Sequence, residues 1–595
     1  MKAVSLLFVL IVAKLGMLAG RPIQISAWTP IAYLWQDVLV AIAFGMIERL
    51  FDRFKAGRVA CWIIYLVLVA FVAINVPVAR VLSSSLTWQM LGATRGALMD
   101  SIRHHATISN LLLMLLVILV GITFPFVHRR RPPMHWRTSR LFLPSAVLFV
   151  AAIAFGPAAT SRIDTVGMDR NAVTALATTL LPRINANTEI MTAKDWRKSP
   201  VIQQDSYEDL SRLRGAATAR NVILILLESA GARYLQLYGS DSNPMPHLSE
   251  IAQSSISFRN AYSVYPESIK GLFSVLCSRY PAVDTDAEKY SSISTPSIAA
   301  VLREAGYHTA LFHSGRFMYL GMEGIVANRG YDVLEDAGAI GGNSESSFGV
   351  DEPSTVQRAL GWIDGLEAGE PFLLTYLPIA GHHPYDTPEA GPFRERTELD
   401  RYLNALHYAD ESMNALISGI RARGLEERTL FVIFGDHGEA FGQHDGNFGH
   451  SLFLYDENIR VPYLISAPGL IKDSLEVTRP ISLIDTAPTI LDLLGVPVPN
   501  EYQGLSALRS RSAMSLFYTD YSLTLMGLRD GRWKYLYEME SGRSKLFDIV
   551  ADPEESKDLA SMHGDRVAAY RERVCEWASA QKALIKGLGN KEGGE

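Results

Sequence analysis

Hydrophobic residues are concentrated in the first 160 positions of the chain. Three stretches there carry no Asp, Glu, Lys or Arg: 59–79, 108–127 and 141–160. Each is about 20 residues long, the length that a helix needs to cross a hydrocarbon core of roughly 30 Å. Two weaker apolar segments precede them, 3–20 with Lys14 and 27–47 with Asp37. The pattern predicts a transmembrane domain of five helices over residues 1–160.

Two features of the weaker segments leave alternatives open. Lys2 precedes an apolar run that ends in small residues at Ala19 and Gly20, which is also the pattern of a cleaved signal peptide. Lys14 and the four spans that follow favour a membrane span instead. An ionisable residue inside a span, such as Asp37, is a functional candidate by default. The interpretation that we favour is that Asp37 lies near a helix end and pairs with another residue of the bundle.

Basic residues indicate how the bundle is oriented. Loops 48–58 and 128–140 are rich in Arg and Lys, whereas loops 21–26 and 80–107 hold four Arg between them. Because cytoplasmic loops carry the excess of Lys and Arg, the two rich loops and the N-terminus are expected in the cytoplasm. Five spans then place everything after residue 160 in the periplasm or outside the cell.

The hydrophobic pattern changes after the spans. Residues 161–220 have mixed character and predict a juxtamembrane connector. From residue 221, short and fully apolar runs alternate with helix-like stretches, of which 296–305 and 400–423 are examples. The predicted strands are 221–227, 309–313, 372–377, 430–435 and 461–466. This alternation predicts that residues 221–595 form an α/β domain with a largely parallel central sheet, covered by helices on both faces.

Composition and charge narrow the function classes. The 595 residues are 48% hydrophobic and 20% charged, with a net charge of −6 and a mean hydropathy of +0.11. A disordered chain would be less hydrophobic and more highly charged, so that class is excluded. No basic excess points to nucleic acid. Three cysteines, with no CxxC pair, provide no disulfide framework.

Candidate chemistry lies where the predicted strands end. Glu228 follows the first strand, and Asp436 and His437 follow the strand at 430–435. Ligands of such sheets bind beyond the carboxyl ends of the strands, and carboxylates with imidazole suit a divalent cation such as Mn²⁺, Mg²⁺ or Zn²⁺. His382 follows another strand, and His450 lies fourteen residues after Asp436. A capping Asp and solvated loop histidines are the alternative interpretation.

At this point the chain resembles a known family. Over about 221–560 it is similar to the sulfatase family of the alkaline phosphatase superfamily. The segment from Ser268 to Pro281 has the spacing of the family signature, (C/S)-x-P-x-R followed by L-T-G-R-Y-P. The other matching segments are NVILILLES (221–229), GYHTALFHSGRFMYLG (306–321), HHPY (382–385), GDHGE (435–439), YDENIRVPYLISAPG (455–469), SLIDTAPTILDLLGVP (482–497) and GRWKYLYEMESGRSKLFDI (531–549).

The departures from the family pattern are informative. Lys270 stands where the family has Pro, and Leu272 where it has Arg. Sulfatases convert their Cys or Ser to formylglycine, and the converting enzyme reads that Pro and Arg, so Ser268 is expected to stay a serine. Glu228 followed by Ser229 replaces two adjacent Asp. This pair and the predicted layout resemble the lipoteichoic acid synthases and related membrane phosphotransferases.

Two features set the chain apart from branches of that group. The Trp-Asn-Arg run that contacts glycerol phosphate in lipoteichoic acid synthases falls here on Leu320, Gly321 and Met322. Glycerol phosphate is therefore not the expected substrate group. Phosphoethanolamine transferases have a similar layout, but their exported domains are usually rich in disulfides, whereas this chain has no disulfide framework. That branch is therefore not the expected one.

The resemblance implies a site and a reaction. Glu228, Asp436, His437 and Ser268 would hold one divalent cation, with Mn²⁺ favoured and Mg²⁺, Zn²⁺ or Ca²⁺ as alternatives. Ser268 would be the nucleophile, and the substrate contacts would be His382, His450, Arg316 (the family's Lys position) and Lys270, which could instead simply be solvated. The implied function is a membrane phosphotransferase that moves a phospho-alcohol group from a lipid or glycan phosphodiester to a glycan of the cell envelope. A hydrolase of sulfate or phosphate esters and a non-catalytic envelope sensor or scaffold are the alternatives.

Overall fold

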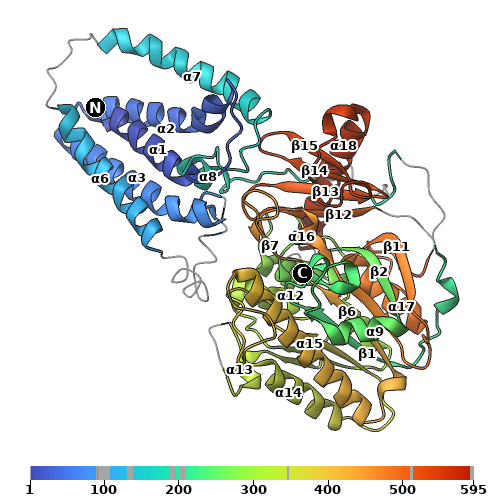
Figure 1. Cartoon of the computed structure of the whole chain (residues 1–595). Helices are drawn as coiled ribbons and strands as arrows, with labels where there is room; N and C mark the ends of the chain where they lie inside the picture. Colours follow the sequence, from blue (N-terminus) through green and yellow to red (C-terminus); the bar gives the residue numbers. More distant parts are fainter. Residues whose placement is uncertain are drawn as a thin grey trace, which may run out of the picture.

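The chain folds into a helical body and an α/β body (Figure 1). The computed structural model describes residues 2–82, 84–88, 90, 107–129, 138–187, 196–201, 208–344, 348–509 and 514–589. A four-stranded sheet and a C-terminal helix lie on the side of the α/β body that faces the helical body (Figure 1).

The helical body contains the helices predicted from the apolar segments. They are α1 (Lys2–Leu18), α2 (Thr29–Phe51), α3 (Lys55–Leu82), α6 (Ile108–Arg129) and α7 (Thr138–Thr160). The helix α1 packs against α2, α3 and α6, and α7 packs against α2. Burial of Leu6, Val9 and Val72 shows that these helices share one apolar interior.

The number of predicted spans was wrong. Among the described residues, three helices are long and apolar enough to cross a membrane: Thr29–Phe51, Lys55–Val81 and Ile108–Val127. The helix α1 has 17 residues and is interrupted by Lys14. In α7, the apolar part whose side chains are described, Ala146–Thr160, is shorter than a span. Three membrane-spanning candidates therefore replace the five that were expected.

Polar contacts close both ends of this body. At one end, Lys2 Nζ lies 3.0 Å from Glu48 Oε1. At the other end, Lys14 Nζ donates to the carbonyl oxygens of Met168, Asp169 and Arg170 at 3.0–3.1 Å. Asp37 lies 3.7 Å from the Lys14 ammonium and accepts a hydrogen bond from Asn171 at 2.5 Å. Asp37 thus pairs with Lys14 of the bundle, as the favoured interpretation expected, but it lies inside α2 and not near its end.

The central sheet is largely parallel, which confirms the predicted fold class. Within the described residues its order is β11-β2-β10-β6-β1-β5-β3-β4, with β9 (Arg460–Val461) paired to β2. The strands are β1 (Asn221–Leu227), β2 (Ser255–Tyr262), β3 (His308–His313), β4 (Val333–Glu335), β5 (Phe372–Leu377), β6 (Thr429–Gly435), β10 (Tyr463–Ser466) and β11 (Leu475–Ser482). The strands β6, β1, β5 and β3 are mutually parallel, so their carboxyl ends share one edge.

One predicted strand has a different form. The apolar run 461–466 is split at Pro462 into β9 and β10, because proline has no N–H to donate to a ladder. The strand β10 runs antiparallel to both β6 and β2. An apolar run by itself does not specify strand direction, so this reversal could not be predicted.

Two cores lie on opposite faces of the sheet. Alternate residues of β1 serve them: Leu224 and Leu226 pack into one, and Ile223 and Ile225 into the other. The first core is covered by α10 (Ser268–Cys277) and α17 (Thr486–Leu494). The second is covered by α9 (Pro246–Ile251), α14 (Glu352–Asp364) and α15 (Glu398–Ala422). Strands with both faces buried read as continuous apolar runs.

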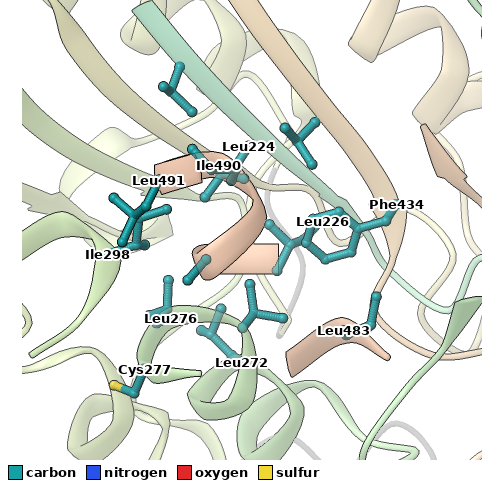
Figure 2. Close-up of a cluster of buried hydrophobic side chains, with 14 of the residues drawn as sticks. Leu224, Leu226, Leu272, Leu276, Cys277, Ile298, Phe434, Leu483, Ile490 and Leu491 are labelled. Atoms are coloured by element: carbon teal, nitrogen blue, oxygen red, sulfur yellow. The ribbon is translucent and has the colours of Figure 1, made fainter. Parts of the chain in front are cut away.

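Helix α10 is fixed by the first of these cores. Figure 2 shows Leu272 and Leu276 of α10 close to Leu226 of β1 and to α17, which carries Ile490 and Leu491. All of these leucines and isoleucines are at most 4% exposed. This packing holds the N-terminus of α10 at the edge where the parallel strands end.

The connector joins the helical body to the C-terminal sheet. Its helix α8 (Ala172–Thr178) is capped by Asn171. The C-terminal sheet consists of β12 (Ser515–Thr519), β13 (Leu525–Asp530), β14 (Trp533–Glu538) and β15 (Arg543–Asp548), followed by α18 (Gly564–Gly589). Asp164, just after α7, pairs with Lys545 at 2.6 Å and with Arg543 at 3.0 Å.

Candidate active site

Two neighbouring strands bring the predicted carboxylates together. Leu227 is paired with Gly435 in the β1–β6 ladder, so the next residues, Glu228 and Asp436, emerge side by side. Asp436 Oδ1 accepts hydrogen bonds from the backbone N–H groups of Ser229 at 2.9 Å and of His437 at 2.8 Å. These contacts fix the orientation of the Asp436 carboxylate.

Ser268 is the first residue of α10 and lies at this carboxylate pair. The side chain of Glu267 caps the helix by accepting from the N–H groups of Ile269 and Lys270. Ser268 Oγ donates to Glu228 Oε2 at 2.8 Å and lies 3.3 Å from His437 Nε2. The residue expected to be the nucleophile therefore contacts two of its expected metal ligands.

The donor set fits a divalent cation. Glu228, Asp436 and His437 are buried, and their ligand atoms lie within 4.8 Å of one another. Burial and the charge of Glu228 raise the pKa of Asp436 to about 6, as expected for two carboxylates held close together. With its proton on Nδ1, 2.9 Å from Gly438 O, His437 presents the Nε2 lone pair to the cluster. Oxygen and imidazole ligands of this kind suit Mn²⁺, Mg²⁺ or Zn²⁺.

A second group adjoins the first and includes Glu439, which the sequence reasoning missed. Glu439 Oε2 lies 2.7 Å from His450 Nδ1, and Glu439 Oε1 accepts from Tyr385 Oη at 3.0 Å. The His450 ring stacks on His437 with centroids 4.2 Å apart. Burial acts to lower the pKa of His450, but Glu439 outweighs it and raises that pKa to about 9. Glu439 is the last residue of GDHGE, so its position in the motif was the available signal.

His382 lies beyond the end of β5, and His313, a second residue that the sequence reasoning missed, is the last residue of the adjacent strand β3. His382 Nδ1 is 2.7 Å from the carbonyl oxygen of His383. His313 ends β3, with Nδ1 3.0 Å from Leu377 O. Burial lowers the pKa of His313, which favours the neutral ring. In the sequence, His313 looked like the end of an apolar strand.

The other two predicted substrate contacts have different surroundings. Arg316 is half-buried in the loop after β3, where its Nη1 approaches Gly338. Lys270 Nζ donates to Asp520 Oδ1 at 2.9 Å, and its side chain is 15% exposed. The structure therefore directs the Lys270 ammonium to a buried carboxylate, and the solvated alternative does not describe it.

Comparisons with known proteins agree with the fold described above. Residues 220–496 match the sulfatase family model, and residues 442–569 match the family described as N-sulphoglucosamine sulphohydrolase, C-terminal. The fold and site define an α/β enzyme with a serine at a buried carboxylate–histidine cluster. Residues 220–496 therefore form a sulfatase-like domain. The fold also matches that of a protein in the alkaline phosphatase superfamily from Vibrio parahaemolyticus, with a TM-score of 0.52 and 19% identity over 67% of this chain and 93% of that chain.

Relatives of this domain include a sulfatase and a lipoteichoic acid synthase-like protein. The chain is 26% identical over 402 residues to the ulvan-active sulfatase of Formosa agariphila, covering 58% of this chain and 77% of that protein. It is 24% identical over 308 residues to the lipoteichoic acid synthase-like protein YvgJ of Bacillus subtilis, covering 49% of each. The fold matches the crystal structure of the lipoteichoic acid synthase LtaP from Listeria monocytogenes with a TM-score of 0.50 and 19% identity, over 64% of this chain and 96% of that chain.

Proposed function

We propose that the chain is a membrane-anchored, metal-dependent phosphotransferase that uses Ser268 as its nucleophile. It would move a phospho-alcohol group from a lipid or glycan phosphodiester to an acceptor in the cell envelope. The observation that carries the proposal is the Ser268 hydroxyl, 2.8 Å from Glu228 Oε2 and 3.3 Å from His437 Nε2. Lys270 and Leu272 stand at the Pro and Arg positions of the family signature, which supports a serine that is not converted to formylglycine.

The reaction follows from the contacts of Ser268. Its Oγ attacks phosphorus, the new O–P bond forms, and the bond from phosphorus to the leaving alcohol breaks. Glu228 Oε2, which already accepts the hydroxyl hydrogen, takes up that proton. The acceptor hydroxyl then attacks the phosphorus of the Ser268 phosphodiester, and the bond from Oγ to phosphorus breaks. Glu228 returns its proton to Oγ, and the acceptor's proton replaces the one that His450 gave to the leaving alcohol. A divalent cation held by Glu228, Asp436, His437 and Ser268 would lower the hydroxyl pKa and offset the charge of the ester.

His450 supplies the cationic side of the site. With its pKa raised to about 9 by Glu439, against the effect of burial, it is an imidazolium at neutral pH. It can bind a nonbridging oxygen or give its proton to the leaving alcohol. His382 would make the same contacts, because it lies beyond the end of β5.

The layout of the bundle supports an external catalytic domain. The basic residues Arg49, Arg53, Lys55 and Arg58 lie where α2 ends and α3 begins. The α/β body contacts the opposite end, where Thr87, beyond α3, donates to Tyr521 O at 3.1 Å. If the basic end is cytoplasmic, the catalytic domain lies on the other side of the membrane, whatever the number of spans.

The site also lies toward the bundle, which suits a lipid donor. A hairpin of β7 (Ala440–Phe441) and β8 (Phe448–Gly449) connects Glu439 to His450. The strand β8 packs against α3. A lipid headgroup at the membrane surface would then reach the site at high effective concentration.

The deciding experiment is mass spectrometry of the purified full chain with candidate lipids. A phospho-adduct on Ser268, absent from Ser268→Ala, is the expected result. The second candidate is a sulfate or phosphate ester hydrolase, which the identity to the ulvan-active sulfatase favours. Formylglycine at position 268, together with efficient turnover of an aryl sulfate, would establish that candidate in place of the transferase.

A further inference from the structure

Asp520 forms a clamp around the nucleophile. Its Oδ1 accepts hydrogen bonds from Tyr265 Oη at 2.7 Å and from Lys270 Nζ at 2.9 Å. These two residues lie three positions before and two positions after Ser268. The Lys270 ammonium also lies over the Tyr265 ring, 4.9 Å from its centroid. One buried carboxylate oxygen therefore binds the chain on both sides of Ser268.

The clamp is buried and charged. Asp520 and Tyr265 are each 2% exposed. Burial opposes ionisation of Asp520, but the charges of Lys270 and Arg183 outweigh it and lower its pKa to about 2. The second carboxylate oxygen accepts from the backbone N–H of Asp284 at 2.7 Å. A carboxylate with these partners has a fixed orientation, and so fixes the groups that it binds.

The segment that carries Asp520 is itself held by the connector. Arg183 donates to the carbonyl oxygens of Asp520 at 2.8 Å and of Ser522 at 3.1 Å. Arg170 donates to the same Ser522 oxygen at 3.1 Å. The Arg170 carbonyl in turn accepts from Lys14 of the helical body. A continuous set of hydrogen bonds thus runs from the helical body to the first turn of α10.

We propose that Asp520 is a positioning residue that fixes the position of Ser268 by binding Tyr265 and Lys270. Arg183 of the connector, in turn, fixes the position of the segment that carries Asp520. The kinetic consequences of this inference rest on the proposed function, whereas its structural consequences do not. Lys270 then acts through Asp520 and does not bind the substrate. The connector therefore helps to position Ser268, in addition to linking the catalytic domain to the helical body.

Kinetics of the full chain test the clamp against direct substrate binding by Lys270. The variants are Asp520→Asn, Lys270→Met, their combination, and Lys270→Arg, with bis(4-nitrophenyl) phosphate as substrate. We expect each of the first two variants to lose about 100-fold in kcat with KM nearly unchanged, because a small misplacement of a reacting group has that effect. The double variant should lose no more than either single one, and Lys270→Arg should retain most of the rate. If Asp520→Asn instead lowers KM at unchanged kcat, Lys270 contacts the substrate and the proposal is overturned.

Hydrogen exchange measured by mass spectrometry provides a readout that needs no activity. Asp520→Asn should speed exchange in residues 265–277, whereas Arg183→Gln should speed it in 519–524 and, through that segment, in 265–277. The matched control is Asp364→Asn, which removes the exposed ion pair with Arg423 and should change neither segment. Unchanged exchange in 265–277 for Asp520→Asn would overturn the clamp, and a change confined to 519–524 for Arg183→Gln would overturn the role of the connector. Absence of wild-type turnover with faster exchange in the variants would refute the proposed reaction and leave the clamp standing.

Discussion

Ser268 and Glu228 are joined by a hydrogen bond of 2.8 Å between residues that lie 40 positions apart. Ser268 belongs to the first turn of α10, and Glu228 directly follows the central strand β1. The contact depends on both the packing of α10 against the sheet and the parallel arrangement of β1 and β6. Because of this contact, replacement of Glu228 should affect both the binding of the cation and the orientation of the Ser268 hydroxyl.

Removal of the proposed cation should lower the stability of the full chain. A ligand that binds only the folded state at about 100 times its Kd adds about 2.7 kcal/mol. We expect chelation to lower the Tm, Mn²⁺ to restore it, and Glu228→Gln to abolish the response. Thermal unfolding of the detergent-solubilised chain measures this, with Glu426→Gln as a control because Glu426 pairs with Arg421 at the surface. An equal Mn²⁺ response in Glu228→Gln would contradict the assigned ligand.

Loss of the Glu439 charge should slow the reaction without disrupting the structure of the site. Glu439 binds His450 and Tyr385, and groups that orient site histidines typically contribute about 10–100-fold to activity. Glu439→Gln is expected to lower kcat by that factor, as steady-state kinetics would show. Tyr385→Phe, which removes only the hydrogen bond to the other carboxylate oxygen, should have a smaller effect. Equal losses of kcat in the two variants would show that the contact between Glu439 and His450 is not the cause of the effect.

The sequence predicted the parts of the site that lie next to strands. Glu228, Asp436 and His437 each follow an apolar run, so the strand-end rule located them and the structure brings them together. Asp520 lies in the segment after β12, at the end of a sheet that was not predicted. Its contact with Lys270 depends on how the C-terminal sheet packs against the segment before α10, where Tyr265 contacts Tyr518, and no local pattern encodes that packing. The same limit explains the direction of β10.

Truncation of Leu276 should destabilise the domain through the core shown in Figure 2. Leu276 is fully buried between α10 and α17. Leu276→Ala leaves a cavity, and such changes lower the free energy of unfolding by about 2–5 kcal/mol. Chemical denaturation measures the change, with Val550→Ala as a control because Val550 is 67% exposed. A loss below about 1 kcal/mol would mean that α10 is not held by this core.

Stability should fall at acid pH in a way that depends on Asp520. The pKa of its carboxyl is lowered from 3.8 to about 2 by Lys270 and Arg183, against the effect of burial. A lowered pKa stabilises the fold above the unfolded value, and this contribution is lost as the pH falls from about 4 to about 2. By linkage it is about 2 kcal/mol. Denaturation between pH 6 and pH 2 should therefore show a smaller decline for Asp520→Asn than for the wild type, and parallel declines would contradict the assignment.

The orientation of the chain can be tested by labelling single cysteines. Arg53 and Asp241 are exposed, one in the basic loop after α2 and the other in the α/β body. In a Cys575→Ser background, which removes the half-buried native thiol, Asp241→Cys should react with an impermeant maleimide from the outer side of sealed membranes. Arg53→Cys should react only after permeabilisation, because the Arg- and Lys-rich loop is expected in the cytoplasm. The reverse labelling pattern would place the catalytic domain in the cytoplasm, and an envelope acceptor would then be out of reach of Ser268.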